Sequence, residues 1–579
     1  MMNADDVNTI DLRSGWQLSI DFAKEASHVE SYVRDEYTDY VGVLAELNGL
    51  EGLDWLVSVT CRNPFQTSVF DKFCKLRLLD RCLAQGVKIE TIVVDDEGMF
   101  NAAFALCAKH QATAQVNIEA DGILPQEERL WSRVTNMFFR LAALLYIASI
   151  SFLIPKLSFW KKVRPDSEII FVDTFVKPTD FDENAEFLDG YYPGMVEHAS
   201  DDDRERIWYA PVFFAAKTPS LLKSLIDSAR ASSTRFLLME DWLKIRDYLF
   251  AIYSAYLLPK NVKQVPEYCG IDVSGIVSAE IKKDVLSTGL FSAILRYRFI
   301  GRLKEQNIRI DRVIDWNENQ ITDRALNLAI RAYYSGVCII GYQGYIVSEH
   351  YVSHEPARYE IEAGTIPDKL CVVCKPLVER KKKYCPELLV TIAPAFRFQG
   401  LLNYYPSGSE NRNIVLLALP VQFEISRAII DLCLGISNST YSFYAKTHPS
   451  INQSDFLRLI PKANDDRFVF VDEPLHTLFA KSILLISSDS SACFEAVSCG
   501  VRVVVIGNSA GPTSNPLDGI VDPRYWKVCY TSKCVIEMLG EGKNGFDLNI
   551  KNLLGKVTSD SVKDFLACNA NKSGLDLRD

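Results

Sequence analysis

Apolar and polar positions follow one another along this chain in a repeating order of strand-like and helix-like stretches. Between residues 50 and 115, the short apolar stretches LDWLVSVT and KIETIVVDD are each followed by an amphipathic stretch with helical spacing. Strands separated by amphipathic helices predict βαβ units around a parallel sheet. This first round predicts an N-terminal α/β domain over residues 1–130.

The same order starts again twice. From residue 166, strand candidates recur at SEIIFVDTFV, RFLLME, DRVIDW, GVCIIGY and DKLCVVC. From residue 413, a third round runs through NIVLLALP, YSFYAKTHP, RFVFVD, SILLISS and VRVVVIG. Two successive α/β halves predict two Rossmann-like domains, residues 166–400 and 401–540, that face each other across a cleft. The expected fold class is therefore α/β and GT-B-like, with an extra N-terminal domain and a helical tail over 541–579.

A hydrophobic and basic junction over residues 131–165 separates the first two rounds. Residues 137–155 are almost wholly apolar, with Arg140 near the start and Pro155 at the end. Three interpretations stay open: a buried helix, a helix in a membrane interface, and a true membrane span. The interfacial interpretation has a ready anchor on an anionic membrane surface in Trp160, Lys161, Lys162 and Arg164.

Composition narrows the class of protein. The chain has 579 residues, of which 48% are hydrophobic and 24% charged, as in folded soluble proteins. Its net charge of −11, without any basic domain, excludes a general nucleic-acid binder. The lone CxxC of Cys371 and Cys374 lacks a second pair or histidines at ligand spacing, so no metal site is expected. Scattered cysteines and an N-terminus without a signal-peptide pattern indicate a cytoplasmic protein.

A cluster of small hydroxyl residues follows one strand of the third round. The strand SILLI ends in residues 487–491, which are Ser, Ser, Asp, Ser and Ser, and a helical stretch follows. A helix N-terminus offers unpaired N–H groups and partial positive charge to a phosphate. A helix cap needs one such residue, whereas four hydroxyls in five positions favour a ligand. With the strand-end sequence KTHP, the predicted ligand-binding residues are Lys446, His448, Pro449, Ser487, Ser488, Ser490, Ser491 and Glu495.

The second round has its own candidates at strand ends. DRVIDW is followed by residues 317–320, in which Glu318 can act as general acid or base if its surroundings raise its pKa. The alternative is that Glu318 caps the following helix. Arg397, near the hinge between domains, binds substrate or pairs with an interdomain carboxylate. The predicted substrate-binding residues are Asn319, Gln320, Gln343 and Arg397.

These segments together carry a resemblance. The order of WNENQ, IGYQG, APAFR, KTHP and SSDSSACFEA resembles bacterial surface-carbohydrate biosynthesis proteins, which are GT-B glycosyltransferases of O-antigen and capsule assembly. The KTHP segment and the serine cluster are similar to the His-Pro and Ser-Ser motifs of bacterial sialyltransferases and Kdo transferases. The resemblance covers roughly residues 166–535. It implies that residues 166–400 hold the acceptor, and that His448 and the serines contact the CMP part of the donor.

The function implied by the resemblance is transfer of an acidic sugar, such as Kdo or a sialic-acid-like sugar. The donor is CMP-activated, and the acceptor is a saccharide or lipid-linked saccharide of a growing surface polysaccharide or lipopolysaccharide. The resemblance also implies no metal, because helix dipoles and basic side chains stabilise the leaving phosphate. Peripheral contact with the inner membrane fits such an acceptor.

This chain departs from one part of the sialyltransferase pattern, and two other functions stay open. The acidic-acidic-Gly base motif is matched in letters by Asp96-Glu97-Gly98, but these residues lie in the first round. A strand-to-helix turn with Asp96 as an acidic N-cap is the alternative. The two other functions are a sugar-nucleotide epimerase of the same fold and a non-catalytic scaffold of a polysaccharide assembly complex.

Overall fold

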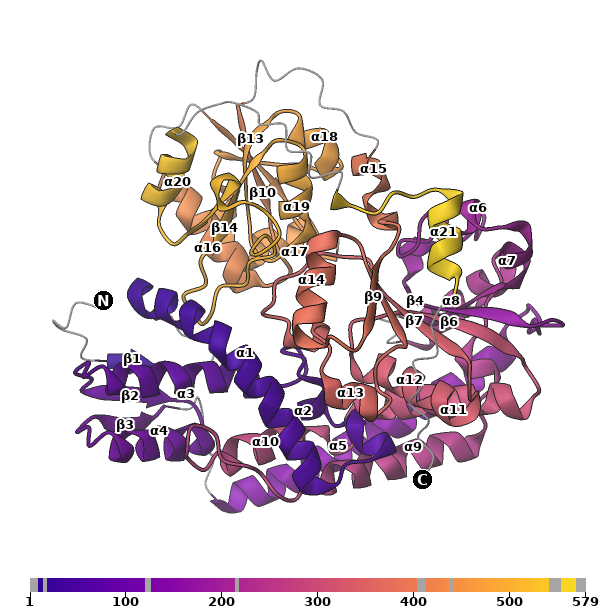
Figure 1. The fold of residues 1–579 in the computed structure, drawn as a ribbon, viewed down its shortest axis with the longest axis horizontal. Helices are drawn as coiled ribbons and strands as arrows, with labels where there is room; N and C mark the ends of the chain where they lie inside the picture. The colour runs from indigo at the N-terminus through magenta and orange to yellow at the C-terminus, as the bar shows by residue number, and fades with distance from the viewer. Residues whose placement is uncertain are drawn as a thin grey trace.

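The computed structural model describes residues 9–13, 18–119, 126–213, 218–402, 413–436, 441–448, 450–540 and 553–568. In Figure 1 the N-terminal domain lies at the lower left, the second domain at the right and the third domain above them. The two larger domains each contain one six-stranded parallel sheet, and the N-terminal domain contains a three-stranded one.

The N-terminal domain is an α/β unit built on a parallel sheet of order β1-β2-β3. The predicted strand LDWLVSVT is wrong, because this stretch forms a 3-10 turn (Gly52–Leu56) and a short helix. A short buried apolar run suits a strand or a helix equally well, and only its packing decides between them. The elements are β1 (Thr9–Asp11), α1 (Ile20–Asn48), α2 (Ser58–Cys61), α3 (Val69–Ala84), β2 (Thr91–Val94), α4 (Glu97–Lys109) and β3 (Gln115–Ile118).

The second domain is doubly wound around a sheet of order β5-β4-β6-β7-β8-β9. Alternate residues of β4 enter different cores: Ile170 and Val172 join one cluster, whereas Ile169 and Phe171 join another. Both faces of the sheet are therefore covered, as a parallel sheet requires. The strands are β4 (Ile169–Val176), β5 (Ile207–Phe213), β6 (Ile310–Trp316), β7 (Cys338–Gln343), β8 (Lys369–Val372) and β9 (Leu389–Ile392).

One predicted strand of this domain is wrong. The segment RFLLME forms one isolated β-bridge, between Phe236 and Tyr209 of the edge strand β5. The chain then turns into a 3-10 helix at Met239–Asp241. The helices are α6 (Met195–His198), α7 (Asp201–Arg206), α8 (Pro219–Ala231), α9 (Ile245–Leu257), α10 (Ser274–Asp284), α11 (Thr288–Glu305), α12 (Ile321–Tyr333), α13 (Arg358–Glu362), α14 (Lys375–Tyr384) and α15 (Gln399–Leu402).

The third domain has the strand order β12-β11-β10-β13-β14-β15, the 3-2-1-4-5-6 order of Rossmann folds. Each of its five predicted strands is confirmed. The strands are β10 (Ile414–Ala418), β11 (Ser442–Lys446), β12 (Phe468–Phe470), β13 (Ser482–Ser487), β14 (Arg502–Ile506) and β15 (Trp526–Cys529). The helices are α16 (Phe423–Leu434), α17 (Gln453–Leu459), α18 (Leu475–Phe479), α19 (Ser491–Ser498) and α20 (Ser532–Gly540). The expected α/β fold with two Rossmann-like domains is thus confirmed by topology.

The C-terminal helix α21 (Ser559–Leu566) returns to the second domain, as Figure 1 shows at the right. The Phe565 ring lies 5.3 Å from the Tyr342 ring and 5.6 Å from the Phe396 ring, centroid to centroid. Two cysteine pairs form disulfides, Cys338–Cys568 and Cys529–Cys534. The scattered cysteine spacing gives no sign of the first pair, because 230 residues separate its partners.

The N-terminal domain is joined to the second domain by helix packing and by a buried ion-pair network. At the crossing of α4 and α10, a Cβ on Gly98 would meet the Gly275 backbone at 2.8 Å, so the helices touch there. Asp96 caps α4 by accepting from the Met99 N–H at 2.8 Å, and it pairs with Lys72 at 2.7 Å. The N-cap alternative for Asp96 is confirmed, and the match of Asp96-Glu97-Gly98 to a base motif is one of letters only.

The junction forms one long helix, α5 (Gln126–Leu153), followed by a 3-10 turn at Ile154–Leu157. Among the described residues, Thr135–Leu157 is the one helical stretch long and apolar enough to cross a membrane, by length and composition. Only 11% of its most apolar window is buried. The buried-helix interpretation is therefore wrong, because α5 packs by one face alone.

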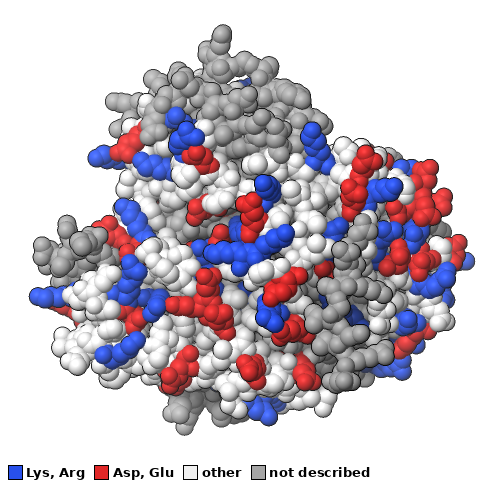
Figure 2. All heavy atoms as spheres, viewed as in Figure 1, with Lys and Arg blue, Asp and Glu red and all other residues white. Residues whose placement is uncertain are grey.

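Charged side chains of both signs share the face of the molecule that Figure 2 shows. On the face shown in Figure 2, acidic and basic side chains are interspersed, with much uncharged surface between them. Many are paired, as Arg204 is with Asp201 and Arg331 with Asp368. Exposed pairs of this kind contribute little to stability.

Candidate functional site

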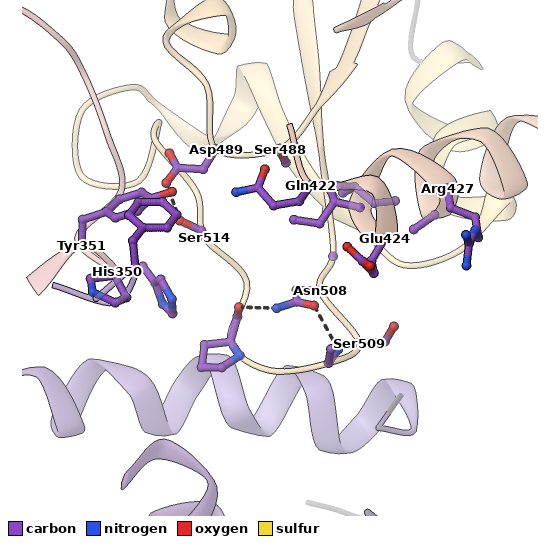
Figure 3. A pocket seen from close by; sticks show the side chains of 18 of the residues that line it. His350, Tyr351, Gln422, Glu424, Arg427, Ser488, Asp489, Asn508, Ser509 and Ser514 are labelled. Atoms are coloured by element: carbon purple, nitrogen blue, oxygen red, sulfur yellow. Dashed lines mark hydrogen bonds between the residues drawn. The ribbon is translucent and has the colours of Figure 1, made fainter. Parts of the chain in front are cut away.

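A cavity of about 370 Å³ lies at the carboxyl edge of the third domain's sheet. The strand order reverses between β10 and β13, and open α/β sheets bind ligands at such a point. Three loops meet there: Gln422 follows β10, Asp489 follows β13 and Asn508 follows β14. Figure 3 shows these side chains around the opening. The cavity thus lies where an open α/β sheet binds its ligand.

The opposite wall comes from the other two domains. His350 and Tyr351 belong to the segment after β7, and Pro64 and Phe65 belong to the N-terminal domain. The Phe65 and Tyr351 rings stack with centroids 5.2 Å apart and planes 29° apart. Burial lowers the pKa of His350 to about 4, so its imidazole is neutral at physiological pH. The N-terminal domain therefore helps to build the site.

Asp489 is the cavity carboxyl with the most partners. Its Oδ2 accepts a hydrogen bond from Ser514 Oγ at 2.6 Å, and its Oδ1 accepts from the Ser348 N–H at 3.2 Å. The Tyr351 hydroxyl is a third partner. Burial raises the pKa of Asp489 to about 6, although these hydrogen bonds oppose the shift. A carboxyl group that titrates near neutrality thus faces the cavity.

The serines around Asp489 have different roles. Ser487 Oγ donates to the Ala418 carbonyl at 2.9 Å, which ties β13 to β10. Ser490 caps α19 by accepting from the Ala492 N–H at 3.2 Å. Ser491 Oγ donates at 3.2 Å to the carbonyl of Ile346 in the second domain. Ser488 lines the cavity. Three of the four hydroxyls therefore already have partners within the protein.

The KTHP segment lies at the same sheet edge but outside the cavity. Lys446 Nζ donates to the carbonyls of Asp472 and Glu473, at 2.9 and 2.8 Å. His448 is exposed, and partial burial together with the positive charge of Lys177 lowers its pKa. The His448 Nδ1 lies 2.7 Å from Ser450 Oγ. Pro449 lies outside the described residues.

Glu318 is held in one orientation beside the domain boundary. Its Oε1 accepts from Trp316 Nε1 at 2.9 Å, and its Oε2 accepts from Gln320 Nε2. Burial raises the pKa of Glu318, against these hydrogen bonds and the charge of Arg397. The N-cap of α12 is Gln320 instead, and Asp323, at the third helical position, accepts from the Gln320 N–H with its Oδ2 at 3.0 Å. The helix-cap alternative for Glu318 is therefore wrong.

Arg397 lies between carboxyl groups of the two Rossmann-like domains. Its guanidinium carbon is 5.8 Å from the centroid of the Trp316 ring. Its charge acts on Glu318 from the second domain and on Glu495 from α19 of the third. Burial raises the pKa of Glu495 to about 7, and Arg397 opposes that shift. The charge of Arg397 thus reaches the sequence-predicted Glu318 and Glu495 from both domains, and none of the three residues lines the cavity described above.

Two predicted substrate-binding residues are corrected. Asn319 is 2% exposed, and its Nδ2 donates to the Ser353 carbonyl at 2.9 Å. Its Oδ1 accepts from Arg324 Nε at 3.0 Å. Gln343 is 3% exposed and donates to the His354 carbonyl at 3.3 Å. Substrate contact through Asn319 or Gln343 is wrong, because both amides are used inside the protein.

Three carboxyl groups beneath Glu318 have the spacing to hold a metal ion. Oxygens of Asp173, Asp315 and Asp323 lie within 4.8 Å of one another, and all three residues are buried. The guanidinium of Arg296 pairs with Asp173 at the same place. Asp323 is also committed to capping α12. A cation is thus already present in this cluster as Arg296.

Titration of Glu495 gives a pH-dependent stability. Between pH 4.5 and 7 the folded chain keeps a proton that the unfolded chain has released, so the unfolding free energy falls as the pH rises. Glu495→Gln is expected to be more stable than the wild type above pH 7, by about 1–3 kcal/mol, and similar to it below pH 4.5. Chemical denaturation across this range measures the difference. Parallel profiles of the two proteins would contradict the buried, protonated carboxyl.

Comparison with known proteins gives remote structural matches. No family model and no curated protein matches this sequence. Solved structures with similar chains include lipopolysaccharide outer core galactosyltransferase WaaB in its apo form, at 13% identity and a TM-score of 0.35. That match covers 69% of this chain and 94% of the other. S. aureus MnaA with UDP gives 13% identity over the same shares, at a TM-score of 0.39. Anabaena HepE with UDP and glucose gives 10% identity over 69% and 98%, at 0.38. At these TM-scores the fold rests on the sheet topology itself.

Proposed function

We propose that this chain is a glycosyltransferase that binds a nucleotide-sugar donor at the carboxyl edge of the third domain's sheet. The observation that carries this proposal is the cavity at the β10–β13 reversal, closed from the other side by His350 and Tyr351 of the second domain. A transferase needs a donor site and an acceptor site that meet, and a cavity between two Rossmann-like domains provides that meeting point.

The chemistry of the cavity suits such a donor. Ser488, Gln422 and Asn508 supply polar groups at strand ends, where ribose, phosphate and sugar hydroxyls bind. The stacked Phe65 and Tyr351 rings supply apolar surface for a base or a sugar ring. The N-terminus of α19 lies beside Ser488 and Asp489, and its N–H groups favour a phosphate.

In the proposed transfer, an acceptor hydroxyl oxygen bonds to the anomeric carbon of the donor sugar. The bond from that carbon to the phosphate oxygen breaks, and its electron pair leaves with the nucleotide. Glu318 takes the hydroxyl proton, since burial raises its pKa and Trp316 and Gln320 orient it. Arg397 and the α19 N–H groups stabilise the leaving phosphate, so the proposed transfer is metal-independent.

The finer proposal is a CMP-activated acidic sugar and a surface-polysaccharide or lipopolysaccharide acceptor. It rests on the resemblance of the KTHP and serine segments, and it is tested by a thermal-shift panel of CMP, UDP, GDP and CDP. CMP is expected to stabilise the protein most, by about 2.7 kcal/mol at a hundredfold excess over its dissociation constant.

A matched pair of histidine variants sharpens this panel. His448→Ala is expected to weaken CMP binding by the role that the resemblance implies, although His448 lies at the sheet edge outside the cavity. His476→Ala, an exposed histidine on α18, is expected to leave it unchanged. A larger shift with UDP would overturn the CMP assignment. No shift with any nucleotide would overturn the transferase proposal and favour a scaffold.

A further inference from the structure

Helix α5 is fastened along the second domain by one face. Leu144 and Ile154 are buried in the protein core. Arg140 Nη1 donates to the carbonyls of Lys283 and Val285, at 2.7 and 2.9 Å. These contacts hold α5 along the protein surface from its middle, at Arg140, to its end. A helix held in this way does not project from the protein as a membrane span would.

The other face of α5 continues into that of α9 as one apolar surface. The two helices lie side by side along the lower edge of the molecule in Figure 1, and the Phe152 and Tyr248 rings meet between them, centroids 6.2 Å apart. The α5–α9 face is defined by six exposed side chains: Phe138, Phe139, Leu153, Phe159, Leu249 and Tyr253. Phe139 and Phe159 expose 69% and 89% of their surface. Apolar surface gathered in this way marks an interaction site.

Basic side chains border this face. Lys156, Lys161, Lys162 and Arg164 are all exposed and follow α5 directly. The Lys156 ammonium lies 3.3 Å from the centroid of the Phe152 ring, and that of Lys162 lies 3.2 Å from the centroid of the Trp242 ring. These are cation–π contacts, which hold both positive charges against aromatic rings beside the apolar face. An apolar face with a cationic rim complements anionic lipid headgroups above acyl chains.

We propose that the α5–α9 face binds an anionic lipid bilayer and lies in its interface without crossing it. The exposed Phe and Leu side chains enter the boundary between headgroups and acyl chains, and the basic rim contacts the headgroups. The protein would then sit on the membrane as a monotopic protein. This inference stands independently of the reaction proposed above, since none of these residues lines the cavity.

Flotation of the full-length protein with lipid vesicles tests the proposal. Vesicles of phosphatidylglycerol and phosphatidylcholine in equal parts are compared with vesicles of phosphatidylcholine alone. The wild type is expected to float with the anionic vesicles. A variant with Phe138→Ser, Phe139→Ser and Phe159→Ser is expected to lose most of this binding, since three inserted rings are removed. Lys161→Gln is expected to weaken it about 5-fold, as one surface charge would.

A control and three contrary outcomes make the test decisive. Ile536→Ser, on α20 at the far end of the molecule, is expected to bind as the wild type does. Each of these variants changes an exposed side chain, and a melting curve checks that each folds. Wild type that ignores both vesicles would overturn the proposal, as would a dimer that dissociates in the triple variant. Salt-resistant binding that the triple Phe→Ser variant keeps in full would indicate a span and overturn it as well.

Discussion

Replacing Glu318 with glutamine is expected to lower turnover by about 10²–10⁴-fold while nucleotide affinity stays nearly unchanged. The amide keeps the shape of the side chain but cannot accept a proton. Both carboxylate oxygens have donors, Trp316 Nε1 and Gln320 Nε2, so the side chain is already oriented. The amide nitrogen cannot accept one of these two hydrogen bonds, but the fold should survive, because Gln320 and Asp323 cap α12 and Glu318 does not.

Asp489→Asn is the matched comparison, because Asp489 is the cavity carboxyl with the most hydrogen-bond partners. It accepts hydrogen bonds from Ser514 and Ser348, so its loss is expected to weaken donor binding and disturb the cavity wall. Single-turnover rates and dissociation constants, measured for both variants, separate these effects. Full activity in Glu318→Gln, with turnover lost and affinity kept in Asp489→Asn, would move the base to Asp489.

Strand-end reasoning predicted much of the fold and part of the site. A buried parallel strand is a continuous apolar run, and its carboxyl end is where polar residues resume, as at Ser487 and Trp316. That rule located Glu318 and the loop containing Asp489. The same rule, applied to the loop after β14, would also have found Asn508.

The rest depends on tertiary contacts that carry no local signal. Asn319 follows β6 as Glu318 does, and Gln343 is the last residue of β7, yet both are turned inward to pair with backbone carbonyls. Tyr351 lies eight residues beyond β7, and Phe65 belongs to another domain, so nothing in their neighbourhood predicts that they stack in one wall. The strand error in the N-terminal domain has the same origin, because only packing decides a short apolar run.

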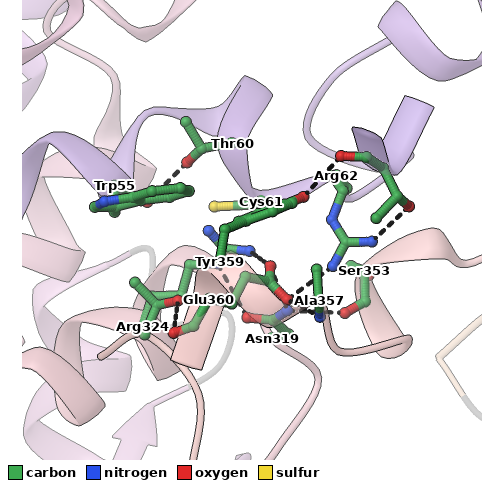
Figure 4. A network of polar contacts seen from close by, with 12 residues as sticks. Trp55, Thr60, Cys61, Arg62, Asn319, Arg324, Ser353, Ala357, Tyr359 and Glu360 are labelled. Atoms are coloured by element: carbon green, nitrogen blue, oxygen red, sulfur yellow. Dashed lines mark hydrogen bonds and ion pairs between the residues drawn. The ribbon is translucent and has the colours of Figure 1, made fainter. Parts of the chain in front are cut away.

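The second large effect is expected on stability, at a buried ion-pair network. Arg62 is 0% exposed, and its Nη2 donates to Glu360 Oε2 at 2.8 Å and to the Glu355 carbonyl at 2.7 Å. Glu360 also pairs with Arg324 through its other oxygen. Figure 4 shows the arginines converging on Glu360, with Asn319 beside it. Arg62 comes from the N-terminal domain, so Glu360 links that domain to the segment that follows Tyr351 of the cavity wall.

Glu360→Gln is therefore expected to destabilise the contact between these domains by about 3–5 kcal/mol, because two buried arginines lose their shared counter-charge. Burial opposes ionisation of Glu360, but the two arginines outweigh it and lower its pKa. The wild type thus keeps the charged network at pH values above the ordinary pKa of glutamate and loses it as the pH falls through the lowered pKa of Glu360.

The matched control is Glu362→Gln on the same helix, whose exposed pair with Arg358 is worth about 0.5 kcal/mol or less. Hydrogen exchange of the α2 and α13 amides measures both variants. Equal protection in both would show that the network adds no stability, and the N-terminal domain would then be held by the α4–α10 packing at Gly98 and Gly275.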